Sequence, residues 1–108
     1  MTNEPIIRSM AVLECHPDKQ EELLSMLREF YTLMQQKGYS RDLLYNDAKE
    51  TSRFVHLRIW NSDEARSLAQ QDPDVHRYWM QLPEVCTITT IYEDLVPVFS
   101  SYKLISEI

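Results

Sequence analysis

The stretch GYSRDLLYNDAKETSRFVHLRIW, residues 38–60, decides the fold. It holds two strand-like runs, 39–46 and 53–60, and the polar residues between them predict a hairpin connection. Gly38, the only glycine of the chain, suits the position just past the end of a helix, because glycine adopts the left-handed conformation without strain. The stretch therefore predicts a hairpin that directly follows the end of a helix.

A strand and a long helix are predicted before the hairpin. In residues 6–15, both the odd-numbered and the even-numbered positions are mostly apolar, which predicts a strand buried on both faces. The helix follows between residue 16 and Gly38, and Pro17 suits its first position. Its apolar residues share one stripe at helical spacing: Leu23, Leu24, Leu27, Phe30, Tyr31 and Met34.

A second helix and a fourth strand are predicted after the hairpin. Asn61 or Ser62 can cap the helix, and the Asp72-Pro73 pair interrupts it before another turn or two. Residues 84–95 then predict a strand rich in β-branched residues. The order β-α-β-β-α-β is that of the ferredoxin-like split βαβ, an α+β fold with both helices on one face of a four-stranded antiparallel sheet. The opposite face needs a cover of its own.

The chain is expected to form one domain over residues 1–108, with the apolar tail 96–108 docked on its own domain or on a partner subunit. A formal net charge of -6 opposes binding to nucleic acid or to an anionic membrane. No run approaches the roughly 18 apolar residues of a spanning helix, and no signal peptide is recognisable, which predicts a cytoplasmic protein. Cys15 and Cys86 are too few and too scattered for a disulfide framework or a zinc site of the CxxC type, and free buried thiols are expected.

Residues 53–60 raise the functional question. Alternation places four unusual side chains on one face of this strand, and if Val55, Leu57 and Ile59 pack on the helices, these four point into the space beyond the sheet. They could form an aromatic wall, a cation that binds an oxyanion and an imidazole that exchanges a proton near neutral pH. The alternative is a dimer interface in which Arg58 and His56 pair with carboxylates of the partner and Trp60 is simply packed. The four residues are Phe54, His56, Arg58 and Trp60.

Three other residues are weaker candidates for the same pocket. His76 is either a half-exposed structural histidine or a general base at the mouth of a groove. Tyr45 and Tyr92 could each donate a phenolic hydrogen bond inside the pocket. No HxxxH or HxH spacing predicts a metal site, and no glycine-rich loop predicts a nucleotide site.

The same residues carry a family resemblance over roughly residues 6–95. The chain resembles the antibiotic biosynthesis monooxygenase type of dimeric α/β barrel in Gly38, in Tyr45-x-Asp47, in the Arg-Phe-Val start at residues 53–55, in Trp60 before an acidic helix start and in Asp72-Pro-x-Val75. The resemblance implies a homodimer whose two sheets face each other, with the ligand in the barrel interior and in the groove beside the second helix.

Activities in this superfamily range from cofactor-independent oxygenation of polycyclic phenols to quinol oxidation, haem degradation and binding without known chemistry. Met10 and Ala69 stand where haem-degrading members use Asn and Trp, which disfavours haem degradation. The family often has Glu where this chain has Arg58, and His where it has Asp74.

The expected function is therefore binding of a small aromatic molecule, with His56 taking a proton from a phenol or quinol and Arg58 stabilising the anion during oxygenation without a cofactor. Two alternatives stay open: a non-catalytic ligand-binding or stress-associated module, and an auxiliary domain that acts only by dimerisation. The last alternative predicts no enclosed cavity.

Overall fold

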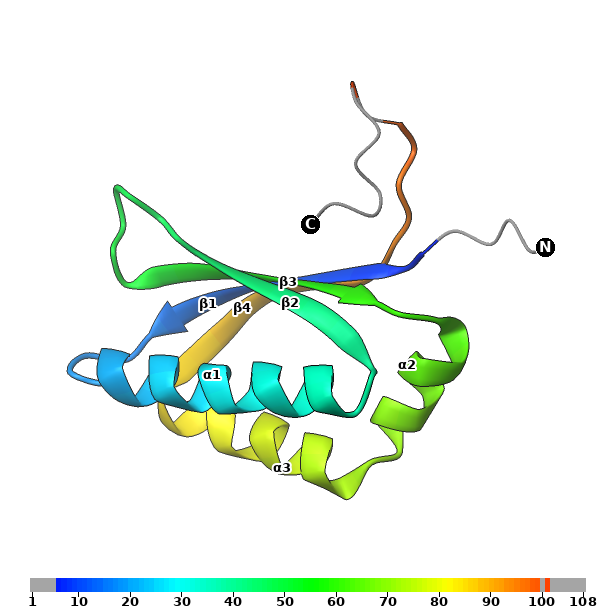
Figure 1. Cartoon of the computed structure of the whole chain (residues 1–108). Coiled ribbons are helices and arrows are strands. Elements are labelled where there is room, and N and C mark those ends of the chain that lie inside the picture. The colour runs from blue at the N-terminus through cyan, green and yellow to red at the C-terminus, as the bar shows by residue number, and fades with distance from the viewer. Residues whose placement is uncertain (1–5, 100, 102–108) are drawn as a thin grey trace.

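The structure, a computed structural model, describes residues 6–99 and 101 (Figure 1). Four strands form one antiparallel sheet in the order β2-β3-β1-β4, and the helices lie together on one face of it (Figure 1). This confirms the predicted ferredoxin-like fold, with the second helix divided in two. The elements are β1 (Arg8–Cys15), α1 (Gln20–Gln36), β2 (Ser40–Asn46), β3 (Arg53–Trp60), α2 (Asp63–Gln70), α3 (Pro73–Gln81), a 3-10 turn (Leu82–Glu84) and β4 (Cys86–Leu95).

The start of α1 differs from the prediction. Helix α1 begins at Gln20 rather than at Pro17, because residues 16–19 form a tight turn closed by a hydrogen bond from the Lys19 amide to the His16 carbonyl at 3.1 Å. Pro17 occupies the second position of this turn and Asp18 the third, with a φ of 63°. Proline favours the second position of a β-turn as readily as the first position of a helix, so its presence did not distinguish the two.

The end of α1 confirms the role of Gly38. Its φ is 73°, in the left-handed region that favours glycine. The Gly38 amide donates to the Gln35 carbonyl at 3.0 Å, and the Tyr39 amide donates to the Met34 carbonyl at 2.9 Å. This pair of bonds is the Schellman ending of a helix, and it turns the chain directly into β2.

A side-chain cap marks the start of α2 and another marks the start of α3. The Ser62 hydroxyl caps α2 by accepting a bond from the Ala65 amide at 2.9 Å. The Asp72 carboxylate caps α3 by accepting from the Asp74 amide at 2.9 Å, and Pro73 follows it at the first helical position.

The orientation of β3 is the reverse of the expected one. Phe54 packs in a buried cluster with Leu23 and Leu27 of α1, so Phe54, His56, Arg58 and Trp60 all face the helices. Val55 and Leu57 lie on the opposite face, where each remains partly exposed. The physical reason is that the bulkier set of side chains fills the space under α1 and α3, and that the charge of Arg58 has a partner on the same face, as described below.

The face opposite the helices is not covered by any described helix (Figure 1). It carries partly exposed apolar side chains from β1, β2 and β3, and Tyr45 and Tyr92 on this face are 55% and 53% exposed. In the tail predicted to dock, Val98 and Phe99 are 85% and 92% exposed, and residues 100 and 102–108 lie outside the described residues. No helix in the described part of the chain is long and apolar enough to cross a membrane.

The pairing of β1 with the edge strand β4 shifts register twice. Leu13 pairs with Ile88 and Val12 with Thr90, so β4 has one additional residue at this point. A second shift lies between Met10, which pairs with Tyr92, and Arg8, which pairs with Leu95. Such β-bulges bend a strand and change which side chains face each side of the sheet. Ile88 and Ile91 consequently both lie on the side of the sheet that faces the helices, where they line a cavity.

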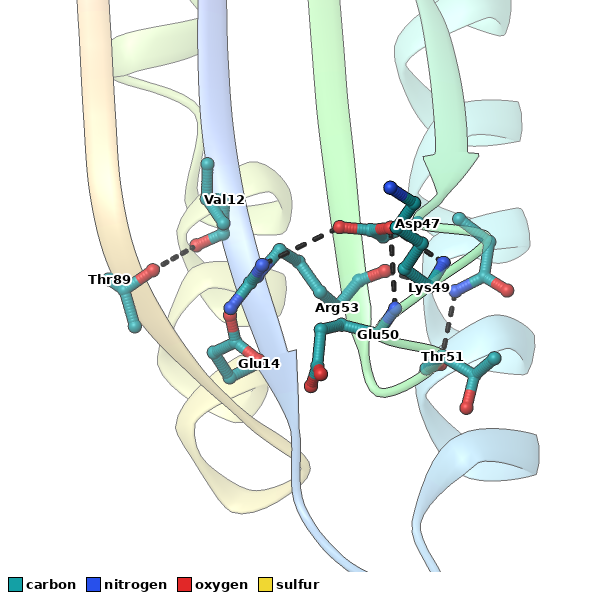
Figure 2. Close-up of polar contacts among 9 residues, drawn as sticks. Val12, Glu14, Asp47, Lys49, Glu50, Thr51, Arg53 and Thr89 are labelled. Carbon is teal, nitrogen blue, oxygen red and sulfur yellow. Dashed lines mark hydrogen bonds and ion pairs between the residues drawn. The ribbon is translucent and has the colours of Figure 1, made fainter.

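The hairpin between β2 and β3 is tied to β1 by polar contacts (Figure 2). The Asp47 carboxylate accepts bonds from the backbone amides of Lys49 and Glu50 at 2.9 and 3.3 Å. These bonds lower the pKa of Asp47 below its usual range. Arg53 reaches Glu14 of β1, with its Nε 2.6 Å from the carboxylate, and also contacts Asp47 at 3.5 Å. This network holds the connection against the neighbouring strand.

Candidate functional site

A buried ion pair lies on the helix-facing side of the sheet. The Arg58 side chain of β3 is 2% exposed, and the Asp42 side chain of β2 is 1% exposed. Arg58 Nε donates to Asp42 Oδ1 at 2.7 Å and Nη2 donates to Oδ2 at 3.4 Å, the forked geometry of an arginine–carboxylate pair. Ser40 donates a further bond to Asp42 Oδ1 at 3.2 Å. Asp42 pairs with Arg58 in the β2–β3 register, which explains why the two side chains meet.

Aromatic rings from three elements surround the Arg58 guanidinium. Its central carbon lies 4.8 Å from the ring centre of Phe30 on α1, 5.4 Å from that of Trp60 on β3 and 5.9 Å from that of Trp79 on α3. Phe30 and Trp79 also meet each other edge to face, at 5.6 Å and 90°. Electron-rich ring faces attract a cation, so the rings and Asp42 together hold the charge in a fixed place.

His56 lies next to Arg58 on the same face of β3 and is hydrogen-bonded to α1. Its Nδ1 is 2.6 Å from the Tyr31 hydroxyl oxygen, and this hydroxyl donates to the Leu43 carbonyl at 3.2 Å. Burial, and in second place the positive charge of Arg58, lower the pKa of His56 from 6.5 to about 3. His56 is therefore neutral at neutral pH, in contrast to the expectation that it exchanges a proton there.

A cavity of about 330 Å³ opens between this face of the sheet and the helices α2 and α3. Its floor is formed by buried residues of β1, β3, α2 and α3: Ala11, His56, Arg58, Trp60, Ala69 and Val75. Its rim is formed by exposed residues: Gln70, His76, Ile91 and Glu93. Trp79 completes the wall.

Two polar atoms of residues on the cavity floor have no hydrogen-bond partner among the described residues: Nη1 of Arg58 and Nε2 of His56. Side-chain nitrogen and oxygen atoms that are fully buried among the described residues all have a partner. Nη1 is a donor that carries positive charge, and Nε2 belongs to a neutral imidazole.

The rim of the cavity is held by bonds between β1, β3, β4 and α2. Trp60 Nε1 donates to the Ser9 hydroxyl at 3.0 Å, and Ser9 donates to the Glu93 carbonyl at 3.0 Å. Arg66 of α2 donates to the same carbonyl at 3.0 Å and pairs with Asp94 at 2.6 Å. These bonds fix the Trp60 ring, which forms part of the wall, and tie α2 to the edge strand.

The seven residues expected to form one pocket are divided between two faces of the sheet. His56, Arg58, Trp60 and His76 line the cavity. Phe54 faces the same way but belongs to the core beside α1. Tyr45 and Tyr92 lie on the opposite face, because they pair with Val55 and Met10 in the sheet register. His76 sits at the rim, where its Nε2 hydrogen-bonds the Gln70 carbonyl.

Sequence reasoning missed Asp42, Tyr31, Trp79 and Arg66 as parts of the site. Asp42 was missed because matching the predicted strands 39–46 and 53–60 end to end places it opposite Leu57, whereas the observed register is shifted by one residue and places it opposite Arg58. Tyr31 was missed because it occupies the apolar stripe of α1 like any core residue. No group of three or more His, Cys, Asp or Glu residues with the spacing of a metal site occurs among residues 6–99 and 101.

Comparisons with known proteins agree with this architecture. The family model for antibiotic biosynthesis monooxygenase matches residues 6–79. No curated protein matches the chain significantly in sequence. Solved structures with the same fold include SnoaB, a cofactor-independent oxygenase from Streptomyces nogalater, with a TM-score of 0.72 and 12% identity over 88% of this chain and 98% of that one. A candidate antibiotic biosynthesis monooxygenase from Chloroflexus aurantiacus has a TM-score of 0.70 and 17% identity over 90% of this chain and 97% of that one. A Pseudomonas aeruginosa protein has a TM-score of 0.72 and 15% identity over 92% of this chain and 100% of that one. At these low identities the likeness establishes the fold alone.

The low pKa of His56 predicts a loss of stability in acid. As the pH falls below 6.5 the unfolded chain gains a proton on His56, whereas the folded protein does not until about pH 3. The free energy of unfolding therefore falls through this window by up to about 1.4 kcal/mol per pH unit on account of His56. In urea denaturation between pH 6 and 4.5, His56→Gln should show a slope shallower by roughly this amount. A His56→Gln slope equal to that of the wild type would refute the assignment.

The buried ion pair predicts an asymmetric response to substitution. Arg58→Ala leaves the Asp42 carboxylate buried without a partner and should lower the free energy of unfolding by about 3–5 kcal/mol. Replacing both partners by leucine should recover most of that loss, because no unpaired charge remains. Arg53→Ala on the same strand, whose ion pair is exposed, should cost below about 1 kcal/mol. Urea denaturation measures the free energy of unfolding of all three variants. If Arg58→Ala lowers it no more than Arg53→Ala does, the Arg58–Asp42 pair is not buried as described.

Proposed function

Because the chain belongs to the antibiotic biosynthesis monooxygenase family, we propose that it binds a small aromatic phenol, enol or quinol in the cavity under α2 and α3 and oxygenates it without a cofactor. The observation that carries the proposal is the pairing, at the floor of one cavity, of an open donor on Arg58 with an open imidazole nitrogen on His56, beside the rings of Trp60 and Trp79. An aromatic wall with a few convergent polar groups is typical of a site for a flat organic ligand.

The two polar atoms suit successive parts of one reaction. Nε2 of His56 accepts the ligand's O–H, and Nη1 of Arg58 binds the oxygen as it becomes an anion. Ionisation makes the ring electron-rich enough to react with dioxygen directly. For a ligand bound as the enol of a ring CH₂ ketone, the overall balance written on the CH₂ form is R₂CH₂ + O₂ → R₂C=O + H₂O: one oxygen atom forms the carbonyl, and the other leaves as water with the two hydrogens.

The low pKa of His56 constrains how the proton moves. An imidazole with a pKa of about 3 does not hold a proton in the resting site. The negative charge that develops on a bound ligand favours the protonated imidazole, because opposite charges in a buried site stabilise each other. His56 thus takes the proton only while the anion is present, and Arg58 supplies permanent stabilisation.

The non-catalytic alternative, a ligand-binding module of the same fold, is favoured by one observation. The charge of Arg58 is already paired with Asp42, and His56 is neutral, so the imidazole on the cavity floor holds no proton to exchange near neutral pH. Such a site would bind a neutral aromatic molecule and leave it unchanged.

Two substitutions distinguish an oxygenase from a binding module: one blocks the cavity, and the other removes the His56 imidazole. Ile91→Trp fills the rim and should weaken binding of anthrone or 1-naphthol at least tenfold, whereas Leu68→Trp, a comparably exposed position on α2 outside the cavity, should not. His56→Gln should retain binding within a few-fold and lower dioxygen consumption with anthrone by about 100-fold. Binding without dioxygen consumption in the wild type would support the module, and no difference between Ile91→Trp and Leu68→Trp would reject the cavity as the site.

We further propose that two copies of the chain pair through the uncovered face of the sheet. This face presents partly exposed apolar side chains beside Tyr45 and Tyr92, and apolar surface of this kind is typical of an interface. A second copy would cover it with an equal surface, as in a symmetric dimer. The resemblance to dimeric α/β barrels supports the same arrangement.

Placing a charge on that face should abolish dimers. Leu57→Arg sets a cation at the centre of the proposed interface, and sedimentation velocity at about 20 µM should give the mass of one chain, against two for the wild type. Met80→Arg, on the exposed side of α3, should remain dimeric. A monomeric wild type at this concentration would contradict the proposal.

The two cysteines support a reducing location such as the cytoplasm. Cys15 and Cys86 are direct partners in the β1–β4 register and are both free thiols. Burial raises the pKa of Cys86 to about 11, so its reactive thiolate form is rare at neutral pH. Facing thiols of this kind persist where the surroundings keep cysteines reduced.

A further inference from the structure

The Tyr31 hydroxyl of α1 makes two contacts with one proton. It lies 3.2 Å from the Leu43 carbonyl oxygen and 2.6 Å from Nδ1 of His56. A carbonyl can only accept, so the contact with Leu43 is a hydrogen bond only when the hydroxyl donates to it. The hydroxyl oxygen then accepts from His56, which places the imidazole proton on Nδ1.

The opposite arrangement satisfies fewer groups. If the hydroxyl donated to Nδ1, its oxygen would face the Leu43 carbonyl oxygen with no hydrogen between them. Burial, and then the negative charge of Asp42, raise the pKa of Tyr31, so the hydroxyl keeps its proton. His56 is neutral and carries one proton on its ring. The arrangement that uses both protons in bonds leaves Nε2 of His56 without one.

Nε2 is the imidazole nitrogen that has no hydrogen-bond partner among the described residues. His56 lines the cavity floor, and no described residue bonds its Nε2. Tyr31 is absent from the cavity lining and contacts the imidazole from behind, with ring centres 5.4 Å apart. Any effect of Tyr31 on a ligand must therefore act through His56.

We propose that Tyr31 is a positioning residue that holds His56 with its proton on Nδ1, so that Nε2 presents a lone pair to the O–H group of a ligand in the cavity. This inference rests on the proposed function for its ligand. The site thereby selects ligands that donate a hydrogen bond at this point and disfavours those that present only an acceptor, such as a ketone or a quinone. The product of the proposed oxygenation is such an acceptor, so the same lone pair that binds the substrate favours release of the product.

Nitrogen-15 NMR of the imidazole decides the tautomer without any ligand or turnover. In the full-length wild-type chain at pH 7, long-range proton–nitrogen spectra should show His56 with a protonated Nδ1 and a bare Nε2. Tyr31→Phe should move the proton toward Nε2, whereas Tyr78→Phe, which removes a hydroxyl from α3 that bonds no described residue, should leave the spectrum unchanged. A wild-type His56 protonated on Nε2 would overturn the proposal even if Tyr31→Phe failed to fold, and so would a Tyr31→Phe protein that kept the wild-type pattern.

Titration with 1-naphthol tests the use of the lone pair. The bare Nε2 resonance should shift on adding 1-naphthol and stay in place on adding 1,4-naphthoquinone, and Tyr31→Phe should weaken 1-naphthol binding about fivefold, the loss of one hydrogen bond. A shift of Nε2 without dioxygen consumption would leave this inference standing while the oxygenase function failed. Binding of 1-naphthol that leaves Nε2 unmoved would overturn the assigned contact.

Discussion

A guanidinium ion buried against a carboxylate, Arg58 against Asp42, is the constraint on which the rest of the structure depends. An unpaired charge at this depth would cost more than a small domain can recover, so the two side chains must face the same way. Because neighbouring residues of a strand alternate between faces, a slip of one residue between β2 and β3 would turn Asp42 to the other side of the sheet. The ring of Phe30 over the guanidinium extends the constraint to the packing of α1. One ion pair thus couples the register of the hairpin to the position of a helix.

The same charge shapes the chemistry of the cavity. Arg58 has its fixed partner in Asp42 and yet keeps one nitrogen open, so it can attract an oxyanion without having to leave a resting salt bridge. Its presence also helps to keep His56 neutral. In the proposed reaction the work is divided, unlike in a catalytic dyad with a shared proton: Arg58 supplies positive charge, and His56 supplies a lone pair and carries no charge at rest. The proposal thereby assigns specificity and anion stabilisation to separate side chains of one strand.

Local signals predicted most of the fold, and long-range ones were needed for the site. The apolar stripe of α1 and the stop at Gly38 depend on neighbours a few residues away, and both are visible in the sequence. The alternation of side chains along β3 correctly divided them into two sets, one for each face of the sheet. Alternation alone does not indicate which of the two sets lies under the helices. That choice depended on Asp42, in a different strand. Pro17 misled for the opposite reason, because a turn and a helix start accept it equally well. The role of Tyr31 required the distance to His56, which no spacing along the chain encodes.

The two bulges in β4 have a consequence for association with other chains. Strand β4 forms one edge of the sheet, and a regular edge offers a row of unpaired amide and carbonyl groups on which a further strand can add. The register shifts near Leu13 and Arg8 interrupt that row within a strand of 10 residues, so no long stretch of β4 presents evenly spaced groups. Open-ended growth of the sheet, the route to fibrous aggregates, is blocked at this edge. The proposed pairing of two copies through the uncovered face of the sheet requires no strand addition at this edge.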